Sequence, residues 1–249
     1  MERKFQPILK IRLMARLSIV PILNHLNQKY LPKVPGYGFL SENARFAELV
    51  KNCGYIFVGP DAESIKLMGD KVMAKKVMSQ AGMPILPGTK EAIIDEEALL
   101  RVAKEIGYPI LLKAVHGGGG RGMKLVTEPE GLINSFKTAS QEALLSFGNG
   151  SMYAERFLQN PHHIEIQIAA DNHGNAIYLG ERECSVQRRH QKLIEESPSP
   201  IITSEIRKKM GETAVKAIQS FGYHNVGTIE FLVDSDRNFY FMEMNTRIQ

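Results

Sequence analysis

Two acidic segments near the end of the chain constrain its fold more than any other feature. The segment Glu243–Gln249, treated as a β-strand, places alternate side chains on opposite faces. One row then contains four polar side chains: Glu243, Asn245, Arg247 and Gln249. The apolar segment 227–233, which comes just before, predicts a neighbouring strand with a single carboxylate, Glu230. Two carboxylates on adjacent strands repel each other, and removing one from water costs several kcal/mol.

A divalent cation would remove this conflict between Glu230 and Glu243. Carboxylates combined with an amide oxygen, such as that of Asn245, are the hard ligands that Mg²⁺ or Mn²⁺ prefers. The alternative is an exposed strand face whose polar side chains contact water. The two segments by themselves leave both interpretations open.

A run of glycines, Gly117–Gly122, formally matches the dinucleotide-binding pattern GxGxxG. That pattern requires a helix directly after the loop, whereas 123–126 predicts a strand. The loop also lacks the Gly-Lys-Ser/Thr ending of a Walker A loop. A strand–loop–strand hairpin remains, whose backbone amides can donate to phosphate oxygens while Lys113 supplies a positive charge. A flexible hairpin tip is the alternative, but consecutive glycines carry an entropic cost.

The segment Gln187–Lys192 contains four basic or histidine side chains in six residues. Such runs are mostly solvated faces or polyanion-binding patches. Glu195 and Glu196 follow closely and weaken a polyanion interpretation. Residues that bind a compact anion, such as bicarbonate or a triphosphate, would give the same pattern.

The rest of the chain predicts alternating helices and strands. Ser41 and Asp61 are expected to be helix N-caps, and residues 55–58 a short buried strand. Further helices are expected over 71–80, 95–106, 128–147 and 203–221, and further strands over 110–113, 123–126, 152–155, 163–170 and 176–182. Residues 171–175 predict the turn of a hairpin. The pattern favours an α+β architecture in which antiparallel hairpins cover a ligand.

The composition is that of an ordinary globular protein, with 249 residues, 43% hydrophobic and 23% charged. Residues 1–33 hold seven Lys or Arg against one Glu, whereas the remainder is slightly acidic, which argues against a general nucleic-acid binder. The two cysteines, Cys53 and Cys184, have no metal-binding spacing and are expected to be core residues or free thiols. No apolar run approaches the roughly 18 residues of a membrane span.

Several ordered motifs carry a resemblance to a known family. They cover residues 35–249 almost continuously and include 35–43 (PGYGFLSEN), 68–71 (MGDK), Lys113-Ala114 with the glycine loop, Asn160-Pro161, 163–167 (HIEIQ), 181–192 (ERECSVQRRHQK), Gly227-Thr228 and 243–249 (EMNTRIQ). The chain resembles the biotin carboxylase component of acetyl-CoA, propionyl-CoA, methylcrotonyl-CoA and pyruvate carboxylases, which are ATP-grasp ligases. Several of these motifs are specific to biotin carboxylases within that superfamily.

The resemblance implies an ATP-grasp fold and a role for each matching residue. Lys71 and Lys113 would hold the ATP phosphates, with Gly119 and Gly120 closing over them on a mobile lid spanning about 85–155. The adenine would lie near Glu155, Arg156, Phe157, Leu158, His163, Gln187 and His190. Glu230, Glu243 and Asn245 would ligate Mg²⁺ or Mn²⁺ between the β- and γ-phosphates.

The resemblance also implies the reaction. Lys192, Arg247 and Gln249 would face bicarbonate, and Lys192 and Arg247 are the expected catalytic residues. Arg247 would in addition stabilise the enolate-like oxygen of biotin, because a permanently charged guanidinium suits an oxyanion. ATP-dependent carboxylation of biotin would proceed through carboxyphosphate.

The same resemblance implies partners and a cellular setting. The expected partners are a biotin carboxyl carrier protein or domain, carboxyltransferase subunits and a second copy of the family's full-length chain. No nucleic acid and no membrane are expected. The expected location is the cytoplasm, with an organellar matrix or a plastid as alternatives, and the expected process is fatty acid biosynthesis.

Three departures from the family set the expected domain limits. Val34 stands where the family usually has His, residues 1–33 do not resemble the family's Rossmann-like domain, and the family continues with Val-Glu-His after Gln249. That Glu is the family's catalytic base. We therefore expect a basic unassigned segment over 1–33, a remnant of the Rossmann-like domain over 34–60, and an ATP-grasp domain over 61–249 that is incomplete at its C-terminus.

Three functions remain open from the sequence. The first is a biotin carboxylase, present in part. The second is a catalytically inactive ATP-binding fragment or assembly module that lacks the catalytic base. The third is another ATP-grasp ligase, such as a relative of carbamoyl-phosphate synthase, against which the Gln187–Lys192 run and Arg247 argue.

Overall fold

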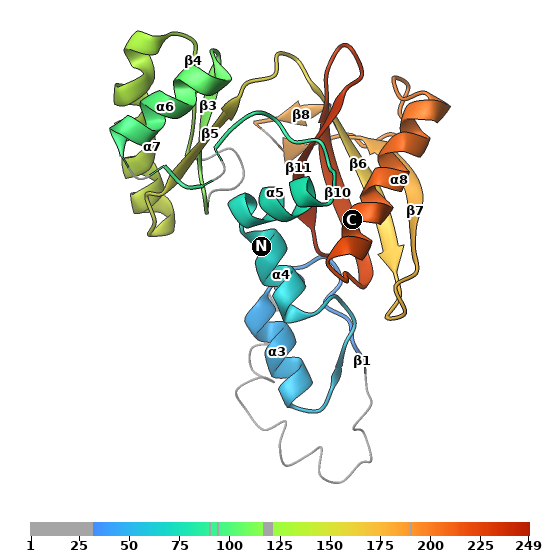
Figure 1. Ribbon diagram of the computed structural model, residues 1–249. Helices are drawn as coiled ribbons and strands as arrows, with labels where there is room; N and C mark the ends of the chain where they lie inside the picture. The colour runs from blue at the N-terminus through green and yellow to red at the C-terminus, as the bar shows by residue number, and fades with distance from the viewer. Residues whose placement is uncertain (1–31, 90, 94, 117–121, 190) are drawn as a thin grey trace.

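The computed structural model describes residues 32–89, 91–93, 95–116, 122–189 and 191–249. Two antiparallel sheets organise most of this part of the chain (Figure 1). The main sheet has the order β11-β10-β6-β7, and the small sheet has the order β4-β3-β5. This arrangement confirms the expected α+β architecture.

Helices and hairpins of the main sheet follow the sequence pattern closely. Its strands are β6 (His162–Ala170), β7 (Ala176–Glu183), β10 (Asn225–Val233) and β11 (Phe239–Asn245). The turn between β6 and β7 is held by Asp171, which accepts hydrogen bonds from the backbone of His173 and Asn175. Helix α8 (Ser204–Ser220) confirms the predicted helix over 203–221, and Thr203 is its N-cap.

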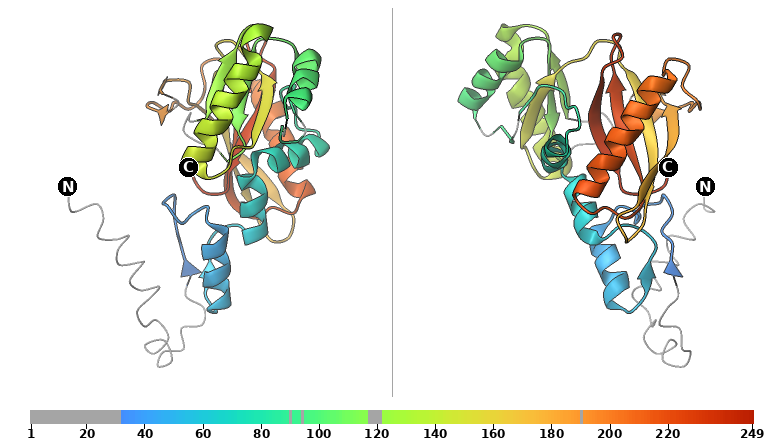
Figure 2. Two further views of the ribbon diagram at one scale, coloured as in Figure 1. Left: turned by 90° about the vertical axis from the view of Figure 1, so that its left-hand side faces the viewer. Right: turned by 45° about the vertical axis from the view of Figure 1, so that its right-hand side comes forward.

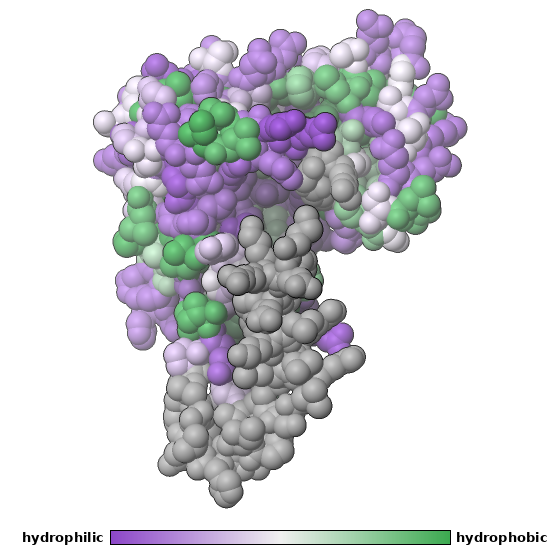
Figure 3. Space-filling model, turned by 180° about the vertical axis from the view of Figure 1, so that it is seen from behind, coloured by the Kyte–Doolittle hydropathy of each residue, from purple (hydrophilic) through white to green (hydrophobic). Residues whose placement is uncertain are grey.

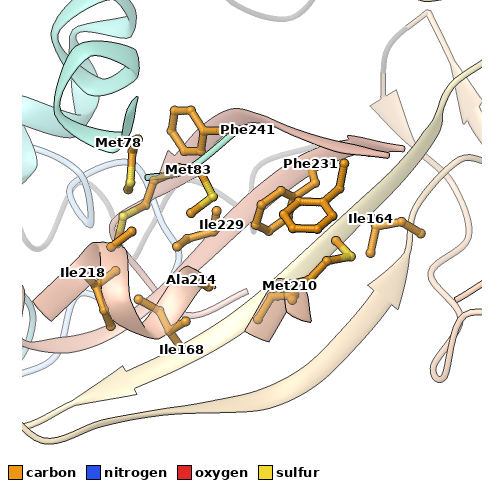
Figure 4. Close-up of a cluster of buried hydrophobic side chains, with 14 of the residues drawn as sticks. Met78, Met83, Ile164, Ile168, Met210, Ala214, Ile218, Ile229, Phe231 and Phe241 are labelled. Carbon is orange, nitrogen blue, oxygen red and sulfur yellow. The ribbon is translucent and has the colours of Figure 1, made fainter. Parts of the chain in front are cut away.

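Alternation along β6 and β10 separates an apolar face from a polar face, although the pairing of β10 with β11 shifts register between Glu230 and Phe231. The apolar face carries Ile164, Ile166 and Ile168 on β6 next to Ile229 and Phe231 on β10, all fully buried. Helices α8 and α5 (Lys71–Gln80) cover this face, and their buried methionines and alanines form one core with its isoleucines and phenylalanines (Figure 4). The polar side chains therefore lie on the opposite side of the same sheet.

The small sheet is built in the same way. It consists of β3 (Ile110–Ala114), β4 (Met123–Val126) and β5 (Met152–Arg156). Helices α6 (Glu96–Ile106) and α7 (Leu132–Phe147) form one core with these strands, and the 3₁₀ turn η1 (Pro129–Gly131) leads into α7 (Figure 2). Because Ile110, Leu112 and Ala114 are buried in this core, the alternate residues of β3 face away from the helices.

The N-terminal part of the described chain differs from the expectation in two respects. Helix α3 (Ala44–Asn52) is capped by Asn43, whose side chain accepts from the Phe46 amide, whereas Ser41 donates to the Gly38 carbonyl and closes the preceding turn. The predicted N-cap at Ser41 is therefore wrong by two residues. Helix α4 (Ala62–Gly69) begins after the N-cap Asp61, as predicted.

The predicted buried strand at 55–58 is also wrong in its burial. Strand β2 (Ile56–Phe57) pairs in parallel with the equally short β1 (Pro32–Lys33), and Ile56 is about half exposed. Two residues on each side make too small a sheet to bury either face.

The last strand ends four residues earlier than predicted. β11 ends at Asn245, because the Thr246 amide donates to a carboxylate oxygen of Glu42 (2.9 Å) and not to a strand partner. Glu243 and Asn245 thus belong to the strand, whereas Arg247 and Gln249 follow it in an irregular segment. A separate two-stranded sheet is formed by β8 (Gln187–Arg188) and β9 (Gln191–Lys192).

The surface behind the view of Figure 1 is mostly hydrophilic, with separate hydrophobic groups (Figure 3). Within the part of the chain that the structure describes, no helix is both long enough and apolar enough to cross a bilayer. Cys184 is buried and Cys53 is exposed, and both are free thiols. Burial raises the pKa of the Cys184 thiol to about 12, in accord with a core residue.

Candidate active site

The polar face of the main sheet brings three carboxylates into one cross-strand row. Glu230 on β10 lies directly opposite Glu243 on β11 and, on its other side, opposite Glu165 on β6. A second row next to it contains Asn245, Thr228 and Gln167. Like charges opposite each other destabilise a sheet unless cations compensate them.

Glu230 is compensated by cationic and polar neighbours from three segments. Its Oε2 lies 2.6 Å from Nε2 of His163, and its Oε1 accepts from Nζ of Lys192 (2.8 Å) and from the side-chain amide of Asn245 (2.7 Å). Burial would raise the pKa of Glu230, but its hydrogen bonds and charge interactions with His163 and Lys192 outweigh burial and lower the pKa to about 2. Glu230 is therefore ionised at any physiological pH.

Glu165 is a second ionic centre, completely buried, beside Glu230. Lys192 bridges the two carboxylates by also bonding Glu165, and Arg182 of β7 bonds the other oxygen of Glu165. Burial acts to lower the pKa of Lys192, but Glu230 and Glu165 raise it overall. The ammonium group of Lys192 is thus a fixed positive charge on the polar face. We call the side chains of Lys192, His163, Glu165, Arg182 and Glu230 the carboxylate network.

Glu243 is less enclosed than the other two acids. Its side chain is about one-third exposed, and Nζ of Lys71, at the start of α5, lies 3.5 Å from its Oε2. Glu230, Glu243 and Asn245 share one face and are all oxygen donors, so the set has the chemistry to hold a hard divalent cation. The amide nitrogen of Asn245 donates to Glu230, and its Oδ1 accepts from Arg247 (3.2 Å). A flip of this amide would exchange the positions of its nitrogen and oxygen.

A second ionic cluster joins the small sheet to α5. Glu155 of β5 is buried and forms salt bridges with Lys113 of β3 through Oε1 and with Lys75 of α5 through Oε2. Burial would raise the pKa of Glu155, but the two lysines lower it to about 2. The ring of Tyr153 lies beneath both ammonium groups, 4.7 Å from that of Lys75 and 6.0 Å from that of Lys113. We call Lys75, Lys113 and Glu155 the lysine cluster.

Arg247 is held in place by side chains from both ends of the described chain. Its Nε donates to Glu42 (2.8 Å), and one terminal nitrogen donates to the side-chain oxygen of Gln249 (2.7 Å). Its other terminal nitrogen bonds Asn245. Asn245 in turn donates to Glu230. Through Asn245, Arg247 and Gln249 are linked to the carboxylate network, although they follow the end of β11.

The remaining predicted residues divide into three groups. Gln187 lies against His163, with 2.6 Å between its Nε2 and the Nδ1 of that ring, and so contacts the carboxylate network through His163. Arg156 is exposed, while Phe157 and Leu158 are half-buried in the segment that leaves β5, and the described contacts give them no side-chain hydrogen bond to the two clusters. Gly119, Gly120 and His190 lie outside the described residues.

Four ionic residues in or beside these clusters were not predicted as site residues from the sequence: Glu165, Arg182, Lys75 and Glu42. Glu165 could have been found, because it alternates with His163 and Gln167 on the same face of a predicted strand. Lys75 lies four residues after Lys71 on a predicted helix, so both lie on one face. Glu42 could not have been found from local pattern, because it meets Arg247 across 205 residues of sequence.

Comparisons with known proteins identify the family to which the chain belongs. The family described as "Carbamoyl-phosphate synthase L chain, ATP binding domain" matches residues 70–249, and "Biotin carboxylase, N-terminal domain" matches residues 16–65. The second match begins within the segment 1–33 that was expected to stand apart. The first match covers most of the chain.

Proteins with high identity to the chain are named biotin carboxylases. Over 215 residues, or 86% of the chain, it is 55% identical to the biotin carboxylase of a Nostoc species, covering 48% of that protein. It is 54% identical to the chloroplastic biotin carboxylase of Arabidopsis thaliana over the same share, covering 40% of that protein. The chain thus spans about half the length, or less, of these relatives.

Solved structures give the same result. A biotin carboxylase–ATP complex from Campylobacter jejuni superposes with a TM-score of 0.84 at 51% identity, covering 88% of this chain and 49% of that one. The biotin carboxylase domain of the 2-oxoglutarate carboxylase of Hydrogenobacter thermophilus, solved with MgADP and bicarbonate, gives 0.83 at 49% identity, with 88% and 48% covered. The chain therefore belongs to the family of the carbamoyl-phosphate synthase L chain ATP-binding domain, and it has the ATP-grasp fold of the biotin carboxylases.

Proposed function

We propose that this chain provides the ATP-binding and metal-binding part of a biotin carboxylase, which carboxylates biotin with bicarbonate through carboxyphosphate. The observation that carries the proposal is the pairing of Glu230 with Glu243 across adjacent strands, with Lys71 beside Glu243 and Lys192 beside Glu230. Two carboxylates that face each other in a setting rich in lysine suit a metal–polyphosphate ligand. The identity to biotin carboxylases supports the choice of reaction.

The proposed metal ligands are Glu230, Glu243 and Asn245. Bound Mg²⁺ or Mn²⁺ would supply charge neutralisation at the β- and γ-phosphates. The low pKa of Glu230 keeps that ligand deprotonated without competition from protons. Lys192 and His163, which neutralise Glu230, hold its carboxylate in one orientation on the sheet.

The proposed nucleotide site lies between the two sheets. Lys71 and Lys113 would hold the phosphates, with Gly119 and Gly120 closing over them, because lysine provides a compact charge for phosphate oxygens. Around the adenine we place the strand end and linker of β5, from Glu155 through Arg156 and Phe157 to Leu158, together with His163, Gln187 and His190. Support comes from α5, whose Lys71 contacts Glu243 of the main sheet and whose Lys75 contacts Glu155 of the small sheet.

The proposed bicarbonate site uses Lys192, Arg247 and Gln249. Lys192 keeps its proton, since the neighbouring carboxylates raise its pKa. Arg247 would orient the anion and stabilise the oxyanion of biotin, and its bonds to Glu42 and Gln249 restrict its side chain beforehand. Lys192 and Arg247 are the catalytic residues of the proposal.

The wider setting is part of the same proposal. The ATP-grasp unit would span 61–249 with a lid over about 85–155, after an N-terminal remnant over 34–60 and a basic segment over 1–33. The partners would be a biotin carboxyl carrier protein or domain, carboxyltransferase subunits and a second copy of the full-length chain. The setting would be acetyl-CoA or related acyl-CoA carboxylation, as in fatty acid biosynthesis, in the cytoplasm or, as for the chloroplastic relatives, in a plastid.

Nucleotide binding is tested by thermal unfolding of the chain with ATP and Mg²⁺. At a ligand concentration 100 times Kd, binding stabilises the folded state by about 2.7 kcal/mol, which corresponds to a rise in Tm of several degrees for a chain of this size. The variant E243Q is expected to lose the Mg²⁺-dependent part of the rise, whereas E212Q, on the exposed surface of α8, is expected to retain it. No rise with wild-type protein would refute the proposal.

Turnover is tested separately by the release of phosphate and the formation of carboxybiotin from ATP, bicarbonate and free biotin. Turnover supports the full reaction. Binding of ATP with no carboxybiotin supports the alternative of an inactive ATP-binding module for this chain. Phosphate release that requires a different acceptor would favour another ATP-grasp ligase.

A further inference from the structure

The lysine cluster has a charge imbalance that the proposed ATP-binding residues do not explain. Glu155 carries one negative charge, whereas Lys75 and Lys113 carry two positive charges, one on each oxygen of the carboxylate. Tyr153 adds no charge, because burial and the nearby Glu155 and Glu243 raise its pKa well above the ordinary value. The cluster therefore has one net positive charge.

Lys75 is the member of this cluster that connects the two sheets. It lies on α5, one turn after Lys71, and α5 packs against the main sheet through Ala74 and Met78. Glu155 and Lys113 lie on neighbouring strands of the small sheet, on the face that points away from α6 and α7. The side chain of Lys75 is only 13% exposed, so its contact between α5 and the small sheet lies inside the protein.

The contact has a direct effect on Lys113. Without Lys75, the single carboxylate of Glu155 would be balanced by Lys113 alone, and the pair would be neutral. With Lys75 present, Glu155 is already balanced from its other oxygen, and the charge of Lys113 remains available to an anion. The pKa of Lys75 is lowered, mainly because its ammonium group is buried. The positive charges of Lys113 and Lys71 lower this pKa further, and Glu155 opposes the decrease without cancelling it.

We propose that Lys75 is a positioning residue for polyphosphate binding: it neutralises Glu155 and ties the small sheet to α5, so that Lys113 presents an uncompensated positive charge to the β- and γ-phosphates. The proposal rests on the proposed function, since it requires a nucleotide at Lys113. It adds a residue that the sequence did not indicate. Lys75 acts through Glu155 and need not contact the nucleotide itself.

The test compares the binding of ATP, ADP and AMP, each with Mg²⁺, to the full chain by calorimetry. For K75M we expect binding of ATP to weaken by about 10- to 100-fold, because one unit charge near the phosphates is lost in a medium of effective dielectric constant near 20. Binding of AMP should weaken by no more than about threefold, since a charge effect grows with the charge of the ligand. K75R, which keeps the charge, should bind ATP within about tenfold of wild type.

A double-mutant cycle isolates the role of Glu155. In K75M/E155Q the carboxylate that would neutralise Lys113 is also removed, so ATP affinity should recover by at least about fivefold relative to K75M. Circular dichroism and thermal unfolding establish that each variant is folded. If K75M does not fold, K75Q replaces it in the same cycle, because it retains a hydrogen-bond donor for Glu155.

Two outcomes overturn the inference. One is equal weakening of ATP and AMP in K75M with no recovery in the double mutant, which indicates a purely structural role. The other is unchanged ATP affinity in folded K75M. Failure of the wild-type chain to bind ATP at all would instead refute the proposed function, so the two failures are distinct.

Discussion

Replacement of Lys192 by Met tests whether the carboxylate network is held together as the structure indicates. Lys192 bridges Glu165 and Glu230, which face each other on adjacent strands and are 0% and 4% exposed. Methionine has nearly the same length but no charge. The K192M variant would therefore leave two buried carboxylates side by side with only His163 and Arg182 to compensate them.

The magnitude follows from the pKa of Glu230. A carboxyl group whose pKa falls from 4.5 to about 2 on folding contributes about 3 kcal/mol to stability at neutral pH. Lys192 provides part of that shift and also compensates Glu165. Removing one partner of a buried ion pair costs 3–5 kcal/mol, and because the other cations remain we expect K192M to lose about 2–3 kcal/mol.

The effect should depend on pH in a defined direction. In the wild type the pKa of Glu230 is depressed, so its stabilisation is complete above the ordinary carboxyl pKa and is lost as the pH falls through about 2. In K192M the carboxylate of Glu230 would lose one of the partners that lower its pKa and would take up a proton at higher pH while folded. The difference between variant and wild type should therefore narrow as the pH is lowered from 7 towards 3.

The measurement is urea unfolding followed by circular dichroism, in the presence of a chelator so that no metal compensates the acids. K208M is the matched control, because Lys208 is exposed on α8 and its contact with Glu212 is long at 3.8 Å, so its change should stay within about 0.5 kcal/mol. A loss below about 1 kcal/mol for K192M, or a deficit that grows as the pH falls, would refute the reasoning.

Two further predictions concern the packing between elements. In G88A the added methyl group would lie 2.6 Å from the carbonyl oxygen of Ala154, so unfolding should become easier by about 1–3 kcal/mol; G69A, at an open helical position, should be neutral or stabilising by up to about 1 kcal/mol, and equal effects in the two variants would contradict this explanation. In R207M the buried Glu181 loses a two-pronged salt bridge that joins α8 to β7, so denaturant unfolding at pH 7 should show a loss of about 3 kcal/mol. Burial acts to raise the pKa of Glu181, but its bonds to Arg207 lower it overall, so the stabilisation is present above the ordinary carboxyl pKa. The loss of stability in R207M should therefore shrink in acid. A loss that is independent of pH would argue against an ionic origin.

Local sequence was sufficient for most elements of the fold. Side-chain alternation identified β6 and β10, and the predicted N-cap Asp61 correctly placed the start of α4. These signals are local, because a strand repeats every two residues and a cap satisfies amides within one turn. The pairing of Glu230 with Glu243 was accessible for the same reason, since both lie on consecutive strands of one hairpin.

The tertiary structure decided which charges meet. The bridging of Glu165 and Glu230 by Lys192, the hold of Glu42 on Arg247 and the sharing of Glu155 between Lys75 and Lys113 all join segments that are distant in sequence. No local periodicity encodes such contacts, because they depend on how whole sheets and helices pack. The sequence by itself thus determined the strands, helices and reactive residue types, whereas packing alone determined which carboxylate each cation neutralises, since electrostatic compensation depends on distance in space and not along the chain.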